Sequence, residues 1–292
     1  MAQGFLQREI TLVGYGNQGQ AWAKNLRDSG FTVRVSGRPD GQGTEKAVQD
    51  GFSVLSASSL RDVSGLVALL LPDESTPEFF RKYLVGGESK QYLFAHGFAV
   101  TFGELPVSPD DDVILVAPKG IGQKLRENFV AGSGVLGVLG VQQDASGQAW
   151  QIANFIAEGL GLARVGVIQS TFKEETYADL FSEQAVLCGA VPRLVEEGIR
   201  YLVRKGIDPK IARYECLNEL KLIVDMMVEH GTDGMFSRIS NAARVGGKKA
   251  AEILTPLSRL EADFDLLWQG IDSGSFAADL LQKRKPEKEI QL

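Results

Sequence analysis

The stretch ITLVGYGNQG, residues 10–19, is the strongest fold signal in this 292-residue chain. An apolar strand, Ile10–Val13, leads into a turn with three glycines and then into a helix, Gly19–Ser29. In dinucleotide-binding folds the first glycine permits the tight turn, the second lets the backbone approach a pyrophosphate, and the third permits close helix–strand packing. Amides at the helix N-terminus then meet the phosphates. The alternative is a glycine-rich turn that binds nothing. The predicted cofactor contacts are Gly14, Tyr15, Gly16, Asn17, Gln18 and Gly19.

The second predicted strand, Thr32–Val35, leads into the residues that would select the cofactor. None of residues 33–38 is an aspartate or glutamate that could accept from a ribose 2′-hydroxyl, as NAD sites usually require. Arg38 instead suits the 2′-phosphate of NADP. Asp40 would repel that phosphate, while Gly41 and Gly43 offer only backbone donors. The sequence therefore favours NADPH and leaves NADH open.

Short apolar runs alternate with helical stretches through the first half of the chain, which is typical of an α/β fold. Runs such as Leu66–Leu71 lack polar alternation, as expected for parallel strands that helices cover on both faces. We predict a Rossmann-type doubly wound sheet over residues 1–169. The expected strands are Ile10–Val13, Thr32–Val35, Leu66–Leu71, Tyr92–Ala95, Val113–Ala117, Gly134–Leu139 and Ala163–Ile168.

The pattern of apolar residues changes after residue 169, and runs typical of strands no longer occur. Apolar residues recur at helical spacing over Thr176–Lys205, Asp208–His230 and Ser240–Leu254. We predict an all-α domain over residues 170–283, followed by a charged tail at 284–292.

The composition excludes some partners. Lys and Arg number 31 against 37 Asp and Glu, and this net charge of −6 argues against a nucleic-acid or anionic-membrane partner. The run Leu66–Leu71 is too short to span a bilayer, and the first residues do not read as a signal peptide. Cys188 and Cys216 lie in apolar stretches and are expected to be buried thiols. We therefore expect a cytoplasmic protein.

Four carboxylates form two pairs at helical spacing. Asp179 and Glu183 are four residues apart, as are Glu215 and Glu219, so each pair lies on one face of a helix. Their apolar neighbours suggest partial burial, which is costly for carboxylates unless they meet cations. Hard oxygen donors without a His or Cys cluster suit Mg²⁺ or Mn²⁺. The alternative is that they are exposed charges or pair with nearby cations, Lys173, Arg213 and Lys221.

Two further polar residues follow predicted strands. His96 and Lys119 stand at carboxyl ends of strands, where ligands bind in open α/β sheets. We take both as candidate catalytic residues, with polar turn positions as the alternative. His230 precedes Gly231 and is expected to end a helix without a catalytic role.

These residues lie in longer segments that resemble the short form of ketol-acid reductoisomerase, from Gly14 to about Gly247. Such long, ordered matches are more specific than any single motif. The matching segments are residues 14–19, Asn25–Gly30, Ala95–Gly97, Ala117–Gly120, Thr171–Thr176, Asp179–Gly189, Glu215–Asp225 and Ile239–Asn241.

The resemblance implies roles for the site residues. Asp179 and Glu183 would hold two Mg²⁺ ions, and Glu219, with Glu215 as a further candidate, would come from the partner subunit of a dimer. Ser240 would hold the substrate carboxylate, while His96 and Lys119 would complete the polar pocket. The family fold has a knotted, dimer-forming helical domain. The family substrates are 2-acetolactate and 2-aceto-2-hydroxybutyrate, on the route to branched-chain amino acids.

The family chemistry fits these residues. Two Mg²⁺ ions would lower the pKa of the substrate hydroxyl and stabilise both oxygens during alkyl migration. Glu219, or a hydroxide held by the metal, would carry the proton. NADPH or NADH would then deliver hydride to the new ketone.

The chain also departs from the family pattern. Gly41 and Gly43 stand where the family usually has serines, and Arg244 stands where an acidic residue is common; Arg244 would bind a substrate carboxylate or neutralise a metal-binding one. Gln123, Leu125 and Ala242 are further departures, so we expect a divergent member. The alternatives are an inactive nucleotide-binding relative and a metal-free hydroxyacid dehydrogenase.

Overall fold

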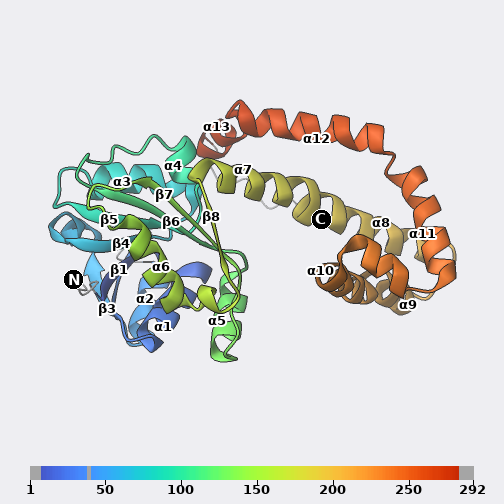
Figure 1. Cartoon of the computed structure of the whole chain (residues 1–292), viewed down its shortest axis with the longest axis horizontal. Coiled ribbons are helices and arrows are strands. Elements are labelled where there is room, and N and C mark those ends of the chain that lie inside the picture. Colours follow the sequence, from blue (N-terminus) through green and yellow to red (C-terminus); the bar gives the residue numbers. More distant parts are fainter. Residues whose placement is uncertain (1–7, 38–40, 283–292) are drawn as a thin grey trace. The chain divides into compact units, whose positions relative to one another are not determined.

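The computed structural model describes residues 8–37 and 41–282 (Figure 1). The described residues divide into two compact units: one holds those up to residue 177 and from residue 277 onward, and the other holds residues 178–276. The boundary expected after residue 169 remains a prediction, and it falls within strand β8 (Val167–Ser170). The predicted tail, 284–292, lies outside the described residues.

An eight-stranded sheet with the order β3-β2-β1-β4-β5-β6-β7-β8 forms the first unit. The doubly wound architecture is confirmed, because all neighbouring strands in the series β3-β2-β1-β4-β5-β6 pair in parallel. The strands are β1 (Glu9–Val13), β2 (Thr32–Gly37), β3 (Ser53–Ser56), β4 (Gly65–Leu69), β5 (Lys90–Phe94), β6 (Asp112–Pro118), β7 (Gly137–Gln143) and β8.

The end of the sheet differs from the prediction, because β7 runs antiparallel to β6. The last residue of β6, Pro118, pairs with the first residue of β7, Gly137. Strand β7 therefore begins at the edge of the sheet where β6 ends, and it runs in the opposite direction. The expected strand at Ala163–Ile168 begins only at Val167, because Leu162–Arg164 form a 3₁₀ turn. Strand β3 was missed, since its four residues are partly exposed and lack an apolar run.

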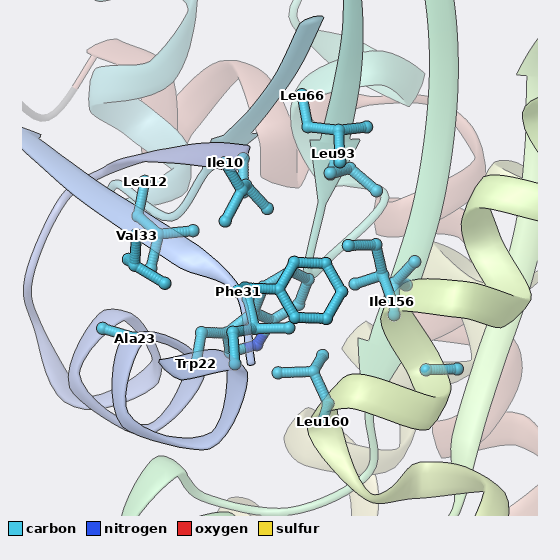
Figure 2. Close-up of a cluster of buried hydrophobic side chains, with 14 of the residues drawn as sticks. Ile10, Leu12, Trp22, Ala23, Phe31, Val33, Leu66, Leu93, Ile156 and Leu160 are labelled. Atoms are coloured by element: carbon cyan, nitrogen blue, oxygen red, sulfur yellow. The ribbon is translucent and has the colours of Figure 1, made fainter. Parts of the chain in front are cut away.

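Helices cover both faces of the sheet. One core cluster joins Ile10 and Leu12 of β1 to Trp22 of the following helix and to Ile156 and Leu160 (Figure 2). A second cluster packs on the opposite face. The all-buried β4 and β6 confirm the inference drawn from the missing polar alternation. The helical elements are α1 (Asn17–Asp28), α2 (Gln42–Gln49), η1 (Ala57–Asp62), η2 (Asp73–Ser75), α3 (Thr76–Tyr83), α4 (Phe98–Phe102), α5 (Gly122–Val130), α6 (Ala149–Leu160) and η3 (Leu162–Arg164).

The second unit is helical, as predicted. Two π-helical segments, η4 (Glu183–Ala190) and η5 (Tyr214–Asn218), interrupt the expected long helices. Gly231, with φ of 71°, breaks α10 (Glu219–Arg238) directly after His230. The elements from residue 172 onward are α7 (Phe172–Ser182), η4 (Glu183–Ala190), α8 (Val191–Arg204), α9 (Pro209–Arg213), η5 (Tyr214–Asn218), α10 (Glu219–Arg238), α11 (Asn241–Leu254), α12 (Leu257–Asp272) and α13 (Ser275–Gln282).

Apolar side chains of the second unit are unusually exposed. Val228, Ile253, Leu254, Leu257 and Leu266 are between 65% and 82% exposed. The prediction of two buried thiols is wrong, since Cys188 is exposed and Cys216 half-buried in the single chain. Within the two described ranges, every helix is too short or too polar to cross a membrane.

Candidate active site

Each of the three glycines after β1 lacks a side chain for a different steric reason. Gly14 has φ of +104°, and a Cβ there would lie 2.6 Å from the carbonyl oxygen of Leu70. A Cβ on Gly19 would collide with the carbonyl oxygen of Gly14, so α1 packs directly on the turn. A Cβ on Gly16 would meet nothing within 4 Å. The turn therefore leaves open space at its middle glycine, where a pyrophosphate needs it.

A cleft of about 1200 Å³ opens beside this turn. Gly14, Tyr15 and Gly16 line it, whereas Asn17, Gln18 and Gly19 do not. Gln18 Nε2 donates to the carbonyl of Gly120, 2.9 Å away. The full lining is Gly14, Tyr15, Gly16, Gln20, Ser36, Gly37, Gly41, Gln42, Gly43, Thr44, Lys46, Leu71, Pro72, Ser75, Glu78, Phe79, Lys82 and Tyr83.

Two lysines that line this cleft were not predicted from the sequence. Lys46 projects from α2 and Lys82 from α3, and among the described lining residues the only carboxylate is Glu78. Lys82 Nζ lies 5.0 Å from the ring centre of Tyr83, which packs on Phe79 at 4.8 Å. No motif marks these helices, and the predicted Arg38 lies outside the described residues.

Tyr15 anchors the glycine turn to the protein. Its hydroxyl donates to Asp50 at 2.8 Å, and Lys24 Nζ lies 2.9 Å from the same carboxylate. Burial raises the pKa of the Tyr15 phenol, and the hydrogen bond to Asp50 adds to the effect. The hydrogen bond from Lys24 lowers the pKa of Asp50. Tyr15 therefore stays a neutral donor, fixed against α1.

His96 and Lys119 occupy neighbouring positions at the carboxyl edge of the parallel strands. His96 Nδ1 lies 2.9 Å from Oδ2 of Asp73, and the ring stacks on Phe98 at 6.3 Å. Lys119 Nζ donates to Oε1 of Glu175 at 2.6 Å.

Glu175 ties these two positions together, although the sequence reasoning gave it no role. Its buried carboxylate accepts from Lys119 and, through Oε2, from the backbone N–H of Gly97 at 2.9 Å. A Cβ on Gly97 would collide with Oγ1 of Thr176, so the loop after His96 lies directly on α7. The sequence signal was the segment Thr171–Thr176, whose acidic residues come just before Asp179.

Of the four predicted metal carboxylates, Asp179 lies in α7 and Glu215 in η5, while the other two lie where α-helix and π-helix meet. Glu183 is the first residue of η4, and Glu219 directly follows η5. Asp179 is half-buried, while Glu183, Glu215 and Glu219 are exposed in the single chain, so the expected partial burial is wrong for these three. Over the described residues, no group of three or more His, Cys, Asp or Glu side chains could hold a metal ion.

The proposed substrate residues begin α11. Ser240 Oγ accepts from the N–H of Ala243 at 3.1 Å and caps the helix. Arg244, one turn later, donates to Oδ1 of Asn241 at 2.7 Å, and both are exposed. Of the other departures, Leu125 is a core residue and Gln123 donates to Glu127 on the exposed side of α5.

The family comparisons cover both units. Residues 5–166 match the family described as acetohydroxy acid isomeroreductase, NADPH-binding domain. Residues 172–291 match ketol-acid reductoisomerase, C-terminal domain.

One solved structure of the same family and two other solved structures with the same fold are similar to this chain. An NADH-preferring ketol-acid reductoisomerase from an uncultured archaeon is 34% identical, with a TM-score of 0.86, over 94% of this chain and 85% of that one. An oxidoreductase from Jannaschia shares the fold at 15% identity and a TM-score of 0.68, covering 94% of this chain and 99% of that one. A semialdehyde dehydrogenase NAD-binding protein from Cupriavidus necator does so at 19% identity and 0.66, over 93% and 98%.

Proposed function

Because the chain belongs to the ketol-acid reductoisomerase family, we propose that it converts 2-acetolactate-type 2-hydroxy-3-keto acids into 2,3-dihydroxy acids. The reaction joins an alkyl migration to a reduction by NADPH or NADH. The observation that carries this proposal is the match of both units to the family, together with a glycine-lined cleft at the sheet edge where His96 and Lys119 lie.

The cleft fits a nicotinamide dinucleotide. Gly16 leaves room for the pyrophosphate, and Phe79 and Tyr83 offer aromatic faces to an adenine. Lys46 and Lys82 would attract the 2′-phosphate of NADPH, whereas Gly43 offers no hydroxyl to it. We therefore propose a modest preference for NADPH. When bound, the nicotinamide supplies the hydride for the reduction.

A divalent metal fits the donor types but needs a second chain. Asp179 and Glu183 supply hard oxygen ligands one helical turn apart, and Glu215 and Glu219 form a like pair. Since the described part of one chain gathers no ligand group, we propose that each site combines one pair with the other pair from a partner subunit. Bound Mg²⁺ would polarise the substrate oxygens.

The exposed apolar side chains of the second unit support this dimer. Five aliphatic residues that are each about two-thirds exposed or more would be costly in water, at roughly 25 cal/mol for each Å² of apolar surface. Surfaces of this kind mark protein contacts. We propose that a second copy of the chain covers them, in the knotted arrangement that the family implies.

The remaining residues would handle the substrate and its protons. Ser240 and Arg244 would hold the substrate carboxylate, since a hydroxyl and a guanidinium both donate hydrogen bonds to it. Glu219 would accept the hydroxyl proton that must leave before the alkyl group migrates. Lys119 would donate to the oxygen that gains charge during migration and reduction, and His96 would complete the polar pocket beside it.

The decisive experiment measures NAD(P)H oxidation with 2-acetolactate while Mg²⁺ is titrated. We expect turnover that requires Mg²⁺. Activity that persists in EDTA would favour a metal-free hydroxyacid dehydrogenase. Cofactor binding without turnover on any acetohydroxy acid would indicate an inactive relative.

A further inference from the structure

Asp73 pairs with His96 and has no role in the proposed reaction so far. Asp73 is the first residue of η2, in the loop after β4, and His96 lies in the loop after β5. Oδ2 of Asp73 lies 2.9 Å from Nδ1 of His96, and both side chains are partly shielded, at 32% and 22% exposure. The contact joins residues 23 positions apart, so it comes from the neighbouring places of β4 and β5 in the sheet.

The chemistry of this contact decides which imidazole nitrogen carries the proton. An ionised carboxylate can only accept hydrogen bonds, so the partner nitrogen, Nδ1, must be the donor. A neutral imidazole protonated at Nδ1 has its lone pair on Nε2. We propose that Asp73 is a positioning residue, which fixes His96 in the Nδ1–H tautomer and directs Nε2 to exchange a proton with the substrate.

Two other contacts hold the pair in place. The ring of Phe98, which is fully buried, stacks on His96 with an angle of 26° between the planes. The turn that carries Asp73 is held by a second contact, in which Thr76 Oγ1 donates to the carbonyl of Pro72 at 3.1 Å. The imidazole is thus held both by its ring face and by its Nδ1.

The same turn borders the cofactor cleft. Pro72 and Ser75, on either side of Asp73, line the cleft, and the N–H of Ser75 donates to the carbonyl of Pro72 at 2.9 Å. A cofactor in the cleft would therefore contact the turn that orients His96. This arrangement links cofactor binding to the geometry of the proton-exchanging group.

The test is direct because the chain has only two histidines, His96 and His230. ¹⁵N-histidine NMR of the full-length protein, with His230→Gln to assign the signals, reports the tautomer of neutral His96 without any turnover. We expect Nδ1–H in the wild type and Nε2–H in Asp73→Asn, because the amide can donate to Nδ1. Asp73→Glu keeps an acceptor and should keep the Nδ1–H form. Glu74→Gln removes a charge from the same turn and should change nothing.

Steady-state kinetics form the second part of the test, and the inference that His96 exchanges a proton with the substrate rests on the proposed function. Asp73→Asn should lower kcat by about tenfold or more, with the Kd for NADPH within about twofold of wild type. Nε2–H in the wild type, the same tautomer in wild type and Asp73→Asn, or an unchanged kcat would overturn the inference. A wild type that shows the Nδ1–H tautomer but turns over no acetohydroxy acid would support the orienting contact and refute the proposed function instead.

Discussion

Lys119 donates a 2.6 Å hydrogen bond to Glu175, a buried carboxylate 56 residues further along the chain. The second oxygen of Glu175 accepts from the N–H of Gly97, next to His96. One carboxylate thus fixes two loops at the carboxyl edge of the sheet and attaches both to α7. The position of Lys119 depends on a residue that would not itself touch a substrate.

Glu175→Gln should therefore impair both folding and turnover. The neutral amide cannot balance the Lys119 ammonium, and losing a charge-assisted hydrogen bond costs about 1.5–3 kcal/mol. Urea unfolding measures the loss of stability, and kcat should fall with it. Glu174→Gln is the matched control, since Glu174 is exposed and its carboxylate accepts a hydrogen bond from the hydroxyl of the nearby Ser170. Equal stability of the two variants would contradict the role of Glu175.

Gly16 and Gly19 should respond to alanine in opposite ways. Gly16→Ala adds a methyl group that meets no protein atom within 4 Å, so the free energy of unfolding should change little while cofactor binding weakens at least about tenfold. Gly19→Ala forces α1 away from Gly14 and should cost about 1–3 kcal/mol of stability, as overpacking does. Thermal unfolding and NADPH titration separate the two. A destabilised Gly16→Ala that binds normally would remove the pyrophosphate from this turn.

Gly43→Ser should raise the preference for NADPH. An added Cβ lies 3.4 Å from the carbonyl oxygen of Tyr15, an ordinary contact, so the serine fits and offers a hydroxyl to the 2′-phosphate. In the wild type we expect kcat/KM for NADPH over NADH to differ by less than about a hundredfold, or ~2.7 kcal/mol. Steady-state kinetics with both cofactors measures this ratio. Gly270→Ser, in α12 and not among the residues that line the cleft, is the control, because its φ is not positive and the nearest atom to an added Cβ is Ser275 Oγ at 3.9 Å.

Tyr15 should make stability depend on alkaline pH. Its pKa is raised in the folded chain above the ordinary 10.0, so an unfolded chain loses this proton first. The contribution of the phenol is fully present below pH 10 and declines above it, by up to about 1.4 kcal/mol for each pH unit. The stability advantage of the wild type over Tyr15→Phe should shrink between pH 10 and 11 in urea unfolding. Tyr201→Phe, which removes an exposed phenol hydroxyl, is the matched control variant.

The proposed sharing of sites between subunits can be tested by complementation. Asp179→Asn and Glu219→Gln should each abolish turnover, and Glu219→Gln should leave the Kd for NADPH nearly unchanged. Co-expression of the two variants would produce mixed dimers in which one of two sites has both native residues. Random pairing then restores about a quarter of wild-type activity. No recovery in purified mixed dimers would mean that each chain builds its own site.

Elements whose causes lie within a few residues could be predicted from the sequence. The glycines at 14, 16 and 19 are required by backbone geometry within a few residues, and unbroken apolar runs predict β4 and β6 because burial on both faces needs no polar side chain. Cofactor class and family also followed, since contiguous segments carry them.

Contacts between distant segments could not be predicted, because they depend on how the whole chain folds. The antiparallel β7, the Asp73–His96 pair and the Glu175–Lys119 bond depend on which strand ends and helices become neighbours, and nothing in the local sequence around Asp73 or Glu175 specifies a partner 23 or 56 residues away. The lysines of the cofactor cleft were missed for the same reason. Side chains on α2 and α3 face one cavity only because the order of β2, β1 and β4 in the sheet brings both helices to it.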